Sequence, residues 1–144
     1  TSYRTSTRVP LIIHVPTMSK GRKTNALVDL IDIYPTVVEL LDLELPKHQL
    51  AGESLVPVLD NPSHDGKSHV FFKNAKGYSI QTQEFSYTEF IDDNNQTFAS
   101  MLYDHRTDGD ENTNVVNEAS YADVVAELSE ILHTKYLSNI LGDL

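Results

Sequence analysis

The pattern of apolar and polar positions in the first part of the chain predicts one strand and two helical regions. Residues 9–15 are almost continuously apolar, which is typical of a strand buried on both faces. Residues 26–43 carry apolar side chains at helical spacing, with Pro35 inside the segment. Because proline is tolerated in the first turn of a helix, we expect Asp32 to cap or break the helix ahead of a second helical piece. Residues 54–59 predict a short helix.

Between residues 69 and 104 the rhythm changes to short strands separated by turn residues. The larger rings at Phe85 and Tyr87 alternate with small polar groups, so one face of that strand is expected to be packed and the other wet. Asn, Asp and Gly residues at 74–77 and 92–95 favour hairpin turns. We therefore expect a four-stranded antiparallel sheet. Its strands are expected at residues 69–73, 77–83, 85–92 and 98–104.

The last part of the chain predicts one amphipathic helix over residues 121–141. Ser120 and Asp123 have the spacing of a capping box, with Asp in place of the usual Glu or Gln. Apolar side chains recur on one side of this helix, and acidic side chains recur on the other. We expect the apolar side to lie across the packed face of the sheet.

Length, composition and charge restrict the class of the protein and its partners. At 144 residues the chain has the size of one domain or of one dependent subdomain. No run approaches the roughly 18 consecutive apolar residues that a membrane span needs, so we expect no span. The formal charge of -10 argues against a nucleic-acid partner, because binding a polyanion needs a clustered basic face. The chain has no cysteine, which excludes disulfides and thiolate metal sites.

Some polar side chains suggest local chemistry, and each has a simpler structural explanation that we favour. Asp104, His105, Asp108 and Asp110 could suggest a metal site, but their spacing does not match a calcium-binding EF-hand loop. A solvated acidic loop, folded by Asp and Asn side chains that bond to their own backbone, explains them. His14 could place a charged imidazole in an anion pocket. A hydrogen-bonded histidine at the end of a strand is the simpler explanation.

The remaining candidates are two arginines, two serines, one asparagine and the other histidines. A guanidinium at Arg4 or Arg8 would suit a sulfate or a carboxylate, although a structural ion pair also accounts for each. Ser54 and Ser120 have no neighbouring base and are best explained as helix caps, not nucleophiles. Asn95 begins a glycosylation sequon, which the loop composition explains without sugar. Surface roles are expected for the scattered histidines His48, His64, His69 and His133.

Short motifs that follow one another in a fixed order carry a resemblance to a known family. They are residues 8–13 (RVPLII), 32–36 (DIYPT), 50–55 (LAGESL), 77–80 (GYSI), 87–89 (YTE) and 102–104 (LYD), followed by Asp108, Glu111 and Asn114. In this order the chain resembles the carboxyl end of sulfatases, and it looks most similar to the iduronate-2-sulfatase branch. The resemblance spans nearly the whole chain, from Thr1 to about Leu132.

This resemblance implies an alkaline-phosphatase-like α/β enzyme that hydrolyses sulfate esters, with the chain as its carboxyl-terminal part. Residues 1–60 would end the large α/β domain, with an edge strand and helix of the large sheet. Residues 61–144 would form a C-terminal subdomain, the small four-stranded antiparallel sheet packed by a C-terminal helix. The family's calcium ion and its formylglycine, which is made from a cysteine, would belong to the parent enzyme upstream of Thr1. No catalytic, substrate-binding or metal residue is carried over to this sequence, because the motifs that hold those groups are absent from it.

The resemblance also implies partners, a location and a role for the chain. The expected partners are the N-terminal catalytic part of the same protein and a sulfated carbohydrate substrate. A periplasmic, secreted or lysosomal location fits the family. We expect the chain alone to be inactive, to support the catalytic part and to form the rim of its pocket. Without that part, the apolar side chains around Leu11, Ile12 and Ile13 should be exposed.

Two departures from the family pattern leave alternatives open. Thr17 stands where the family usually has Gly after the Val-Pro pair, and Gln81 stands where the iduronate branch often has Arg. The second departure leaves the sugar preference open. Two other functions also stay open, namely a stand-alone binding or interaction module and part of a related hydrolase that acts on phosphate esters.

Overall fold

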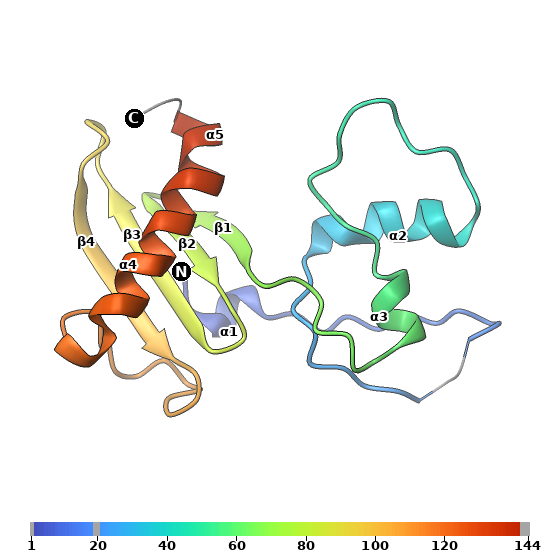
Figure 1. Cartoon of the computed structure of the whole chain (residues 1–144), viewed down its shortest axis with the longest axis horizontal. Helices are drawn as coiled ribbons and strands as arrows, with labels where there is room; N and C mark the ends of the chain where they lie inside the picture. The colour runs from blue at the N-terminus through green and yellow to red at the C-terminus, as the bar shows by residue number, and fades with distance from the viewer. Residues whose placement is uncertain (1, 19–20, 142–144) are drawn as a thin grey trace. The chain divides into compact units, whose positions relative to one another are not determined.

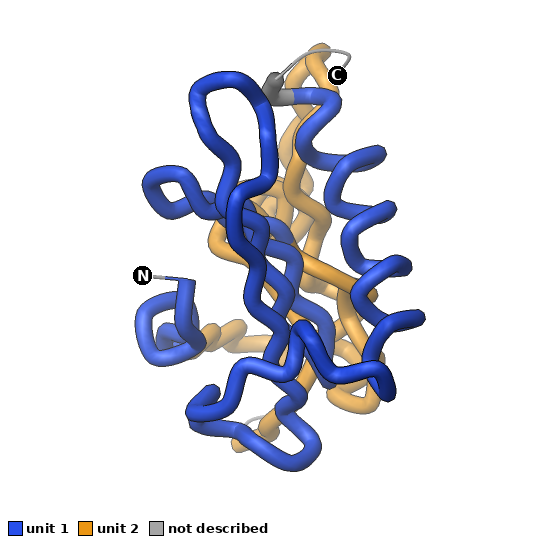
Figure 2. The backbone as a smooth tube through the Cα atoms, turned by 90° about the vertical axis from the view of Figure 1, so that its left-hand side faces the viewer, with its two compact units in different colours: residues 1–10, 71–144 blue, residues 11–70 orange. Residues whose placement is uncertain are grey.

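The computed structural model describes residues 2–18 and 21–141, and the chain divides into two compact units. The sheet unit joins Thr1–Pro10 to Phe71–Leu144, and the helical unit comprises Leu11–Val70. Figure 1 labels the elements of both units, and Figure 2 colours the sheet unit blue and the helical unit orange. The amino-terminal residues therefore belong with the sheet, although the whole helical unit separates the two in sequence.

The sheet has four strands in the order β1-β2-β3-β4, as the sequence predicts. The pairs β2–β3 and β3–β4 are antiparallel. Ala75 and Asn95 take left-handed backbone angles at the two expected hairpin turns, with φ of 51° and 62°. Each expected strand is present, with ends that shift by one or two residues. The strands are β1 (Val70–Asn74), β2 (Gly77–Gln81), β3 (Phe85–Ile91) and β4 (Thr97–Asp104).

The core of the sheet unit lies between one face of the sheet and the helix α4 (Ala122–Leu132), which crosses it in Figure 1. Phe85 and Tyr87 point into this core, as their alternation predicts. Burying these apolar side chains supplies the main favourable contribution to the stability of the unit. The buried members of the core are Tyr78, Ile80, Phe85, Tyr87, Ile91, Leu102, Leu128, Leu132 and Leu137.

The second face of the sheet was expected to be wet, and the structure corrects this expectation. Ser86 and Thr88 on this face are each only 2% exposed. The amino-terminal segment lies against the face, where the ring of Tyr3 packs on Tyr103 with 5.7 Å between the centroids. The hydroxyl groups of Thr88 and Ser79 are 2.7 Å apart and satisfy each other, which makes burial of these small polar groups tolerable.

The carboxyl-terminal helix forms as a succession of short helical elements. The 3-10 turn η2 (Ala119–Tyr121) leads into α4, which continues through a π turn, η3 (His133–Leu137), into α5 (Ser138–Leu141). The π turn has a clear reason, because Leu132 and Leu137 are both fully buried and their spacing of five residues needs a wider turn. No helix in the described part of the chain is long and apolar enough to cross a membrane.

The expected capping box at Ser120 and Asp123 does not form. No side-chain hydrogen bond caps the start of η2 or of α4. Ser120 lies inside the 3-10 turn, so it is not at the position from which a side chain caps the following helix. The turn itself begins the helix here.

The helical unit contains η1 (Leu30–Asp32), α2 (Ile33–Leu40) and α3 (Val56–Asp60), in place of the expected helical regions 26–43 and 54–59. α2 begins directly after Asp32, but Asp32 neither breaks nor caps it, because the backbone stays helical there and no side chain caps α2. The Asp32 carboxylate instead accepts the main-chain N–H of Asp29 at 2.8 Å, as part of a capping box at the start of η1. The short amino-terminal helix α1 (Arg4–Thr7) belongs to the sheet unit and was not expected.

Residues 9–15 differ from the strand that the sequence predicts. They have no regular secondary structure and pair with no strand in the described part of the chain. A strand needs hydrogen bonds to a neighbouring strand, and an apolar segment of this kind needs a sheet that covers both of its faces. The described residues form one four-stranded sheet, and it does not include this segment.

Two of the short motifs meet in the helical unit. Asp32 is fully buried, and its Oδ1 accepts the main-chain N–H of Glu53 at 2.8 Å and contacts Lys67 Nζ at 2.6 Å. Thr36, one turn later, accepts the main-chain N–H of Leu55 at 2.8 Å through its hydroxyl oxygen. The motif at residues 32–36 therefore holds the motif at residues 50–55 in place.

Candidate functional site

A buried carboxylate, Glu89, lies between the sheet and the carboxyl-terminal helix. It is 2% exposed. Its Oε1 accepts hydrogen bonds from the hydroxyl groups of Tyr87 at 2.9 Å and Ser129 at 2.7 Å. Its Oε2 accepts a hydrogen bond from the Thr97 hydroxyl at 2.8 Å and contacts His133 Nε2 at 2.9 Å. We call these five residues the Glu89 cluster, and it joins β3, β4 and the helix.

The electrostatics of the Glu89 cluster follow from its hydrogen bonds. Burial alone would raise the pKa of Glu89, but the hydrogen bonds from Ser129, His133, Thr97 and Tyr87 together outweigh it and lower the pKa. Burial raises the pKa of Tyr87, and the neighbouring Glu89 raises it further. The cluster therefore holds an ionised carboxylate next to a neutral phenol.

The Glu89 cluster contains a serine, a histidine and a carboxylate, yet its geometry is not that of a catalytic triad. In a triad the imidazole lies between the hydroxyl and the carboxylate, so that it can take the hydroxyl proton. Here Glu89 lies in the middle and binds Ser129 and His133 separately. Ser129 therefore has no base placed to activate it, and the cluster fastens the helix to the sheet.

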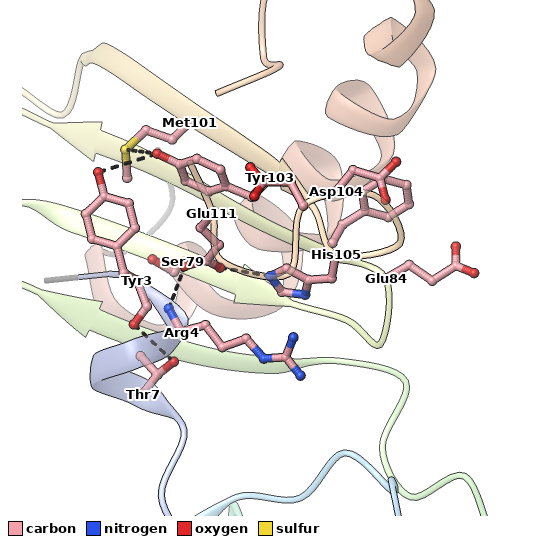
Figure 3. A network of polar contacts seen from close by, with 12 residues as sticks. Tyr3, Arg4, Thr7, Ser79, Glu84, Met101, Tyr103, Asp104, His105 and Glu111 are labelled. Atoms are coloured by element: carbon pink, nitrogen blue, oxygen red, sulfur yellow. Dashed lines mark hydrogen bonds and ion pairs between the residues drawn. The ribbon is translucent and has the colours of Figure 1, made fainter. Parts of the chain in front are cut away.

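A second buried carboxylate, Glu111, follows β4 and reaches the amino-terminal segment (Figure 3). Its Oε1 lies 2.8 Å from His105 Nε2, and its Oε2 accepts the main-chain N–H of Arg4 at 2.6 Å. The hydroxyl groups of Tyr3 and Tyr103 are 3.4 Å apart beside this pair. We call Tyr3, Arg4, Tyr103, His105 and Glu111 the Glu111 cluster. It connects the beginning of the chain to the loop after β4.

The loop between β4 and η2, which contains Glu111, is folded by hydrogen bonds to its own side chains, as the sequence predicts for its Asp and Asn residues. Asp108 accepts the main-chain N–H of Thr113 at 2.7 Å and the side-chain amide of Asn112 at 3.1 Å. The main-chain bond to Thr113 is the chief reason that the pKa of Asp108 is lowered. Asp110 is exposed. Glu111 lies within the same loop, and its φ of 56° is in the left-handed region.

Asp104 has a structural role at the end of β4. Its carboxylate accepts two hydrogen bonds from the guanidinium of Arg106, at 2.9 and 2.7 Å, and one from the Tyr121 hydroxyl at 3.0 Å. The bonds from Arg106 hold the pKa of Asp104 well below its usual range. The hydrogen bond from Tyr121 joins the end of the sheet to η2, at the start of the helical region.

The arginines and serines proposed from the sequence have different surroundings. Arg4 contacts Glu111 through its main chain, and its Nε is buried without a hydrogen-bond partner among the described residues. Arg4 is therefore held by its main chain and not by the side-chain ion pair that the sequence suggested. Arg8 is exposed. Ser54 accepts the main-chain N–H of Val56 at 3.2 Å, but the residue at the cap position of α3 is Leu55 and no side chain caps this helix, so the expected capping role of Ser54 is wrong.

The other sequence candidates do not gather into a site. His14 and His48 are exposed, and His64 accepts the main-chain N–H of Gly66 at 3.1 Å. His69 contacts the Ser68 hydroxyl at 2.8 Å. Asn95 is exposed at the tip of the β3–β4 hairpin.

The sequence interpretation named Glu89 and Glu111 within the family motifs but did not predict that either carboxylate is buried or pairs with a histidine. His133 was expected at the surface, but it reaches Glu89 from the helix. One signal was available, because Glu89 continues the inward alternation of Phe85 and Tyr87 along β3. A charged residue at an inward position needs buried donors. Glu111 gave no such signal, since it lies in a loop.

Comparison with known families identifies the chain. A family model described as N-sulphoglucosamine sulphohydrolase, C-terminal, matches residues 1–137. The chain belongs to this sulfatase family. The expectation of a sulfatase carboxyl-terminal part is therefore confirmed, while the iduronate-2-sulfatase branch stays a prediction.

Curated relatives of this sulfatase domain include arylsulfatase K from two vertebrates. The chain is 29% identical over 130 residues to arylsulfatase K of Xenopus laevis, covering 81% of the chain and 24% of the relative. It is 28% identical over 145 residues to arylsulfatase K of Homo sapiens, covering 92% of the chain and 26% of the relative. The chain thus spans about a quarter of the length of these relatives.

Solved structures with the same fold support the expected fold class. One is a protein in complex with its substrate D-glucosamine-2-N,6-O-disulfate, with a TM-score of 0.64, 26% identity and coverage of 78% of this chain and 24% of that one. Another is a phosphonate monoester hydrolase from Silicibacter pomeroyi, with a TM-score of 0.68 and 21% identity. The similarity covers 88% of this chain and 28% of that one. The fold is that of the carboxyl-terminal part of alkaline-phosphatase-like sulfatases.

The chain's own residues do not fit the calcium ion or the formylglycine that this sulfatase family implies for a whole enzyme. No three His, Asp or Glu side chains within residues 2–18 and 21–141 are arranged to hold a metal ion. The sequence contains no cysteine from which formylglycine could be made. Both buried carboxylates are occupied by structural donors. The clusters of this sulfatase domain serve to position the backbone.

Proposed function

We propose that the chain is the carboxyl-terminal part of a sulfatase that hydrolyses sulfate esters of sugars, and that the catalytic groups lie upstream of it. The observation that carries this proposal is the sulfatase family match over residues 1–137. The clusters around Glu89 and Glu111 support a scaffolding role, because both oxygens of each carboxylate already contact donors within the chain. The chain supports the catalytic part and contributes to the rim of its pocket.

The proposed substrate is a sulfated sugar of the kind on which iduronate-2-sulfatases act. The order of the motifs supports this branch, and a structural relative of 26% identity was solved with D-glucosamine-2-N,6-O-disulfate as its substrate. Gln81 at the end of β2 stands where the iduronate branch often has Arg. A neutral amide binds a uronate carboxylate more weakly than a guanidinium does, so the preferred sugar depends on this position.

The calcium ion and the formylglycine are proposed for the upstream part of the parent protein. A periplasmic, secreted or lysosomal location of the parent is likewise a proposal from the family. The boundary of the large domain near residue 60 also belongs to this proposal. All of these points concern residues that precede the chain or the way in which it joins them.

Sulfate release by the full-length parent protein tests the proposed function. We expect the parent to release sulfate from 2-sulfated iduronate or from D-glucosamine-2-N,6-O-disulfate, and the isolated 144-residue chain to release none. Ion chromatography of free sulfate measures both reactions. Turnover by the isolated chain would contradict the assignment of the chemistry to the upstream part, and a parent without turnover on either sugar would contradict the substrate class.

A related phosphorus-ester hydrolase is a second candidate for the parent. The observation that favours it is a phosphonate monoester hydrolase of Agrobacterium radiobacter, with 27% identity, a TM-score of 0.55 and coverage of 72% of this chain and 23% of that one. The same fold therefore accompanies phosphonate ester hydrolysis in a relative. Faster hydrolysis of a phenyl phosphonate monoester than of a sulfated sugar would favour this candidate.

A further inference from the structure

We propose that Glu111 is a positioning residue that fixes the amino-terminal strap, residues 2–8, and thereby sets the turnover of the parent enzyme. The inference rests on the proposed function, because it assumes that the chain upstream of the strap carries the catalytic groups. Glu111 acts on the reaction through the backbone of the strap and touches no substrate.

The strap is held closely against the second face of the sheet. Ser2 is 7% exposed, and a Cβ atom added at Gly77 of β2 would lie 3.2 Å from its hydroxyl oxygen. A glycine at this position therefore leaves room for the strap. Tyr3 packs on Tyr103, as Figure 3 shows. The strap ends with the main-chain N–H of Arg8 bonded to the carbonyl oxygen of Arg4.

Glu111 fixes the strap by its backbone. The main-chain N–H of Arg4 donates a hydrogen bond to Glu111 Oε2 at 2.6 Å. A main-chain contact sets the path of the polypeptide whatever side chain residue 4 carries. The other carboxylate oxygen is held by His105 at 2.8 Å, so the carboxylate cannot rotate freely. The pair therefore fixes both the direction and the register of the strap.

Two features of Glu111 are energetically unfavourable, although its contact with Arg4 is kept. Glu111 has a φ of 56°, in a region that costs energy for a residue other than glycine, and its carboxylate is buried, with the residue 5% exposed. Such strain persists where the surrounding structure over-determines it, and it gathers at functional positions. No catalytic or metal site within the described residues accounts for the strain, so we assign it to positioning of the strap.

A small displacement of the strap is expected to reach the reacting groups. A misplacement of about 1 Å far from the chemistry can reduce turnover by about a hundredfold. The strap is the first part of this chain, so it leads directly to whatever precedes it in the parent. We therefore expect Glu111→Ala to reduce kcat of the parent about tenfold or more and to change KM less than about twofold.

The experiment compares Glu111→Ala with Glu89→Ala in the full-length parent protein. Both variants remove a buried carboxylate from the same sheet unit, but only Glu111 bonds to the strap. Release of sulfate gives kcat and KM at a temperature where both variants are folded, and hydrogen exchange gives the protection of the Arg4 amide. We expect the Arg4 amide to lose its protection and kcat to fall in Glu111→Ala alone.

Equal turnover of the two variants, each corrected for its folded fraction, would overturn the proposal. So would a wild-type Arg4 amide that exchanges as fast as unstructured chain. If Glu111→Ala does not fold, Glu111→Gln replaces it, because the amide oxygen of Gln can still accept a hydrogen bond from the Arg4 N–H. We then expect kcat and the protection of the Arg4 amide to lie between those of the wild type and those of unstructured chain. Wild-type values for both quantities would overturn the proposal. A wild-type parent that releases no sulfate refutes the proposed function, while the Arg4 exchange still decides whether Glu111 holds the strap.

Discussion

At the scale of single residues, the two buried carboxylates show how a charge is accommodated in a small core. A carboxylate that leaves water loses much of its solvation energy, and donors must replace the lost water. Glu89 obtains these donors from side chains of the sheet and the helix. Glu111 obtains one of them from the backbone of a distant segment. The same residue type therefore fastens a helix in one place and a strap in the other.

Glu89→Gln is expected to lower the free energy of unfolding by about 2 kcal/mol at pH 7. The substitution removes charge-assisted hydrogen bonds, and it places the NH2 group of the Gln side chain next to groups that also donate. The effect should shrink in acid. The Glu89 pKa is lowered in the folded state, so its stabilisation is present above the ordinary Glu pKa of about 4.3 and is lost as the pH falls through the folded value.

Urea denaturation of the wild type and of Glu89→Gln between pH 2 and pH 7 measures this difference. Glu127→Gln on the exposed side of α4 is the matched control, and its stability should equal that of the wild type at pH 7. A constant difference between Glu89→Gln and the wild type across the whole pH range would contradict the electrostatic explanation.

At the scale of elements, local pattern was sufficient where a segment and its partner both lie in the chain. The hairpins, the sheet order and the apolar side of the helix all follow from alternation, turn residues and helical spacing. The pattern failed for residues 9–15, because a strand needs a neighbouring strand and none within residues 2–18 and 21–141 pairs with this segment. It also failed for the face that carries Ser86 and Thr88, because the covering segment comes from the opposite end of the sequence.

The candidate site was less predictable than the fold. The partners of Glu89 and Glu111 lie up to 107 positions away, and no local pattern encodes such a contact. His133 was expected at the surface because the histidines are scattered along the sequence without the spacing of metal ligands. Only the packing of the helix across the sheet brings it to Glu89.

Leu132→Ala is expected to lower the free energy of unfolding by about 3 kcal/mol, because the side chain is fully buried where α4 meets the π turn and truncation leaves a cavity. Thermal unfolding followed by circular dichroism measures the loss. Leu132→Met conserves volume and should cost less than about 1.5 kcal/mol. Equal losses in the two variants would show that the π turn leaves room for the helix to repack.

At the scale of the whole molecule, the exposed apolar side chains are unequally distributed. Most of them lie in the helical unit. They include side chains of residues 11–13, where the sequence predicts exposed apolar side chains. There Ile12 is 91% exposed, while Leu11 is 38% exposed and Ile13 is half-buried. The exposed members in the helical unit are Leu11, Ile12, Leu30, Ile31, Ile33, Tyr34, Val37, Leu41, Leu43 and Leu45.

The isolated chain is therefore expected to bind an apolar dye and to self-associate, since large apolar side chains exposed in one unit favour contact with a partner. Ile12→Glu should reduce both dye fluorescence and light scattering. Thr17→Glu, at an exposed polar position in the same segment, adds the same charge and is the control. A monodisperse wild-type chain without dye binding would contradict the expectation.

The contact between Arg4 and Glu111 also fixes an order of events during synthesis. The two residues are 107 positions apart, so the strap leaves the ribosome long before its acceptor exists. Contacts of such long range form late, because the intervening chain must first be brought together. The start of this chain is therefore among the last parts to be secured, and a ribosome that stalls before residue 111 leaves the strap without its anchor.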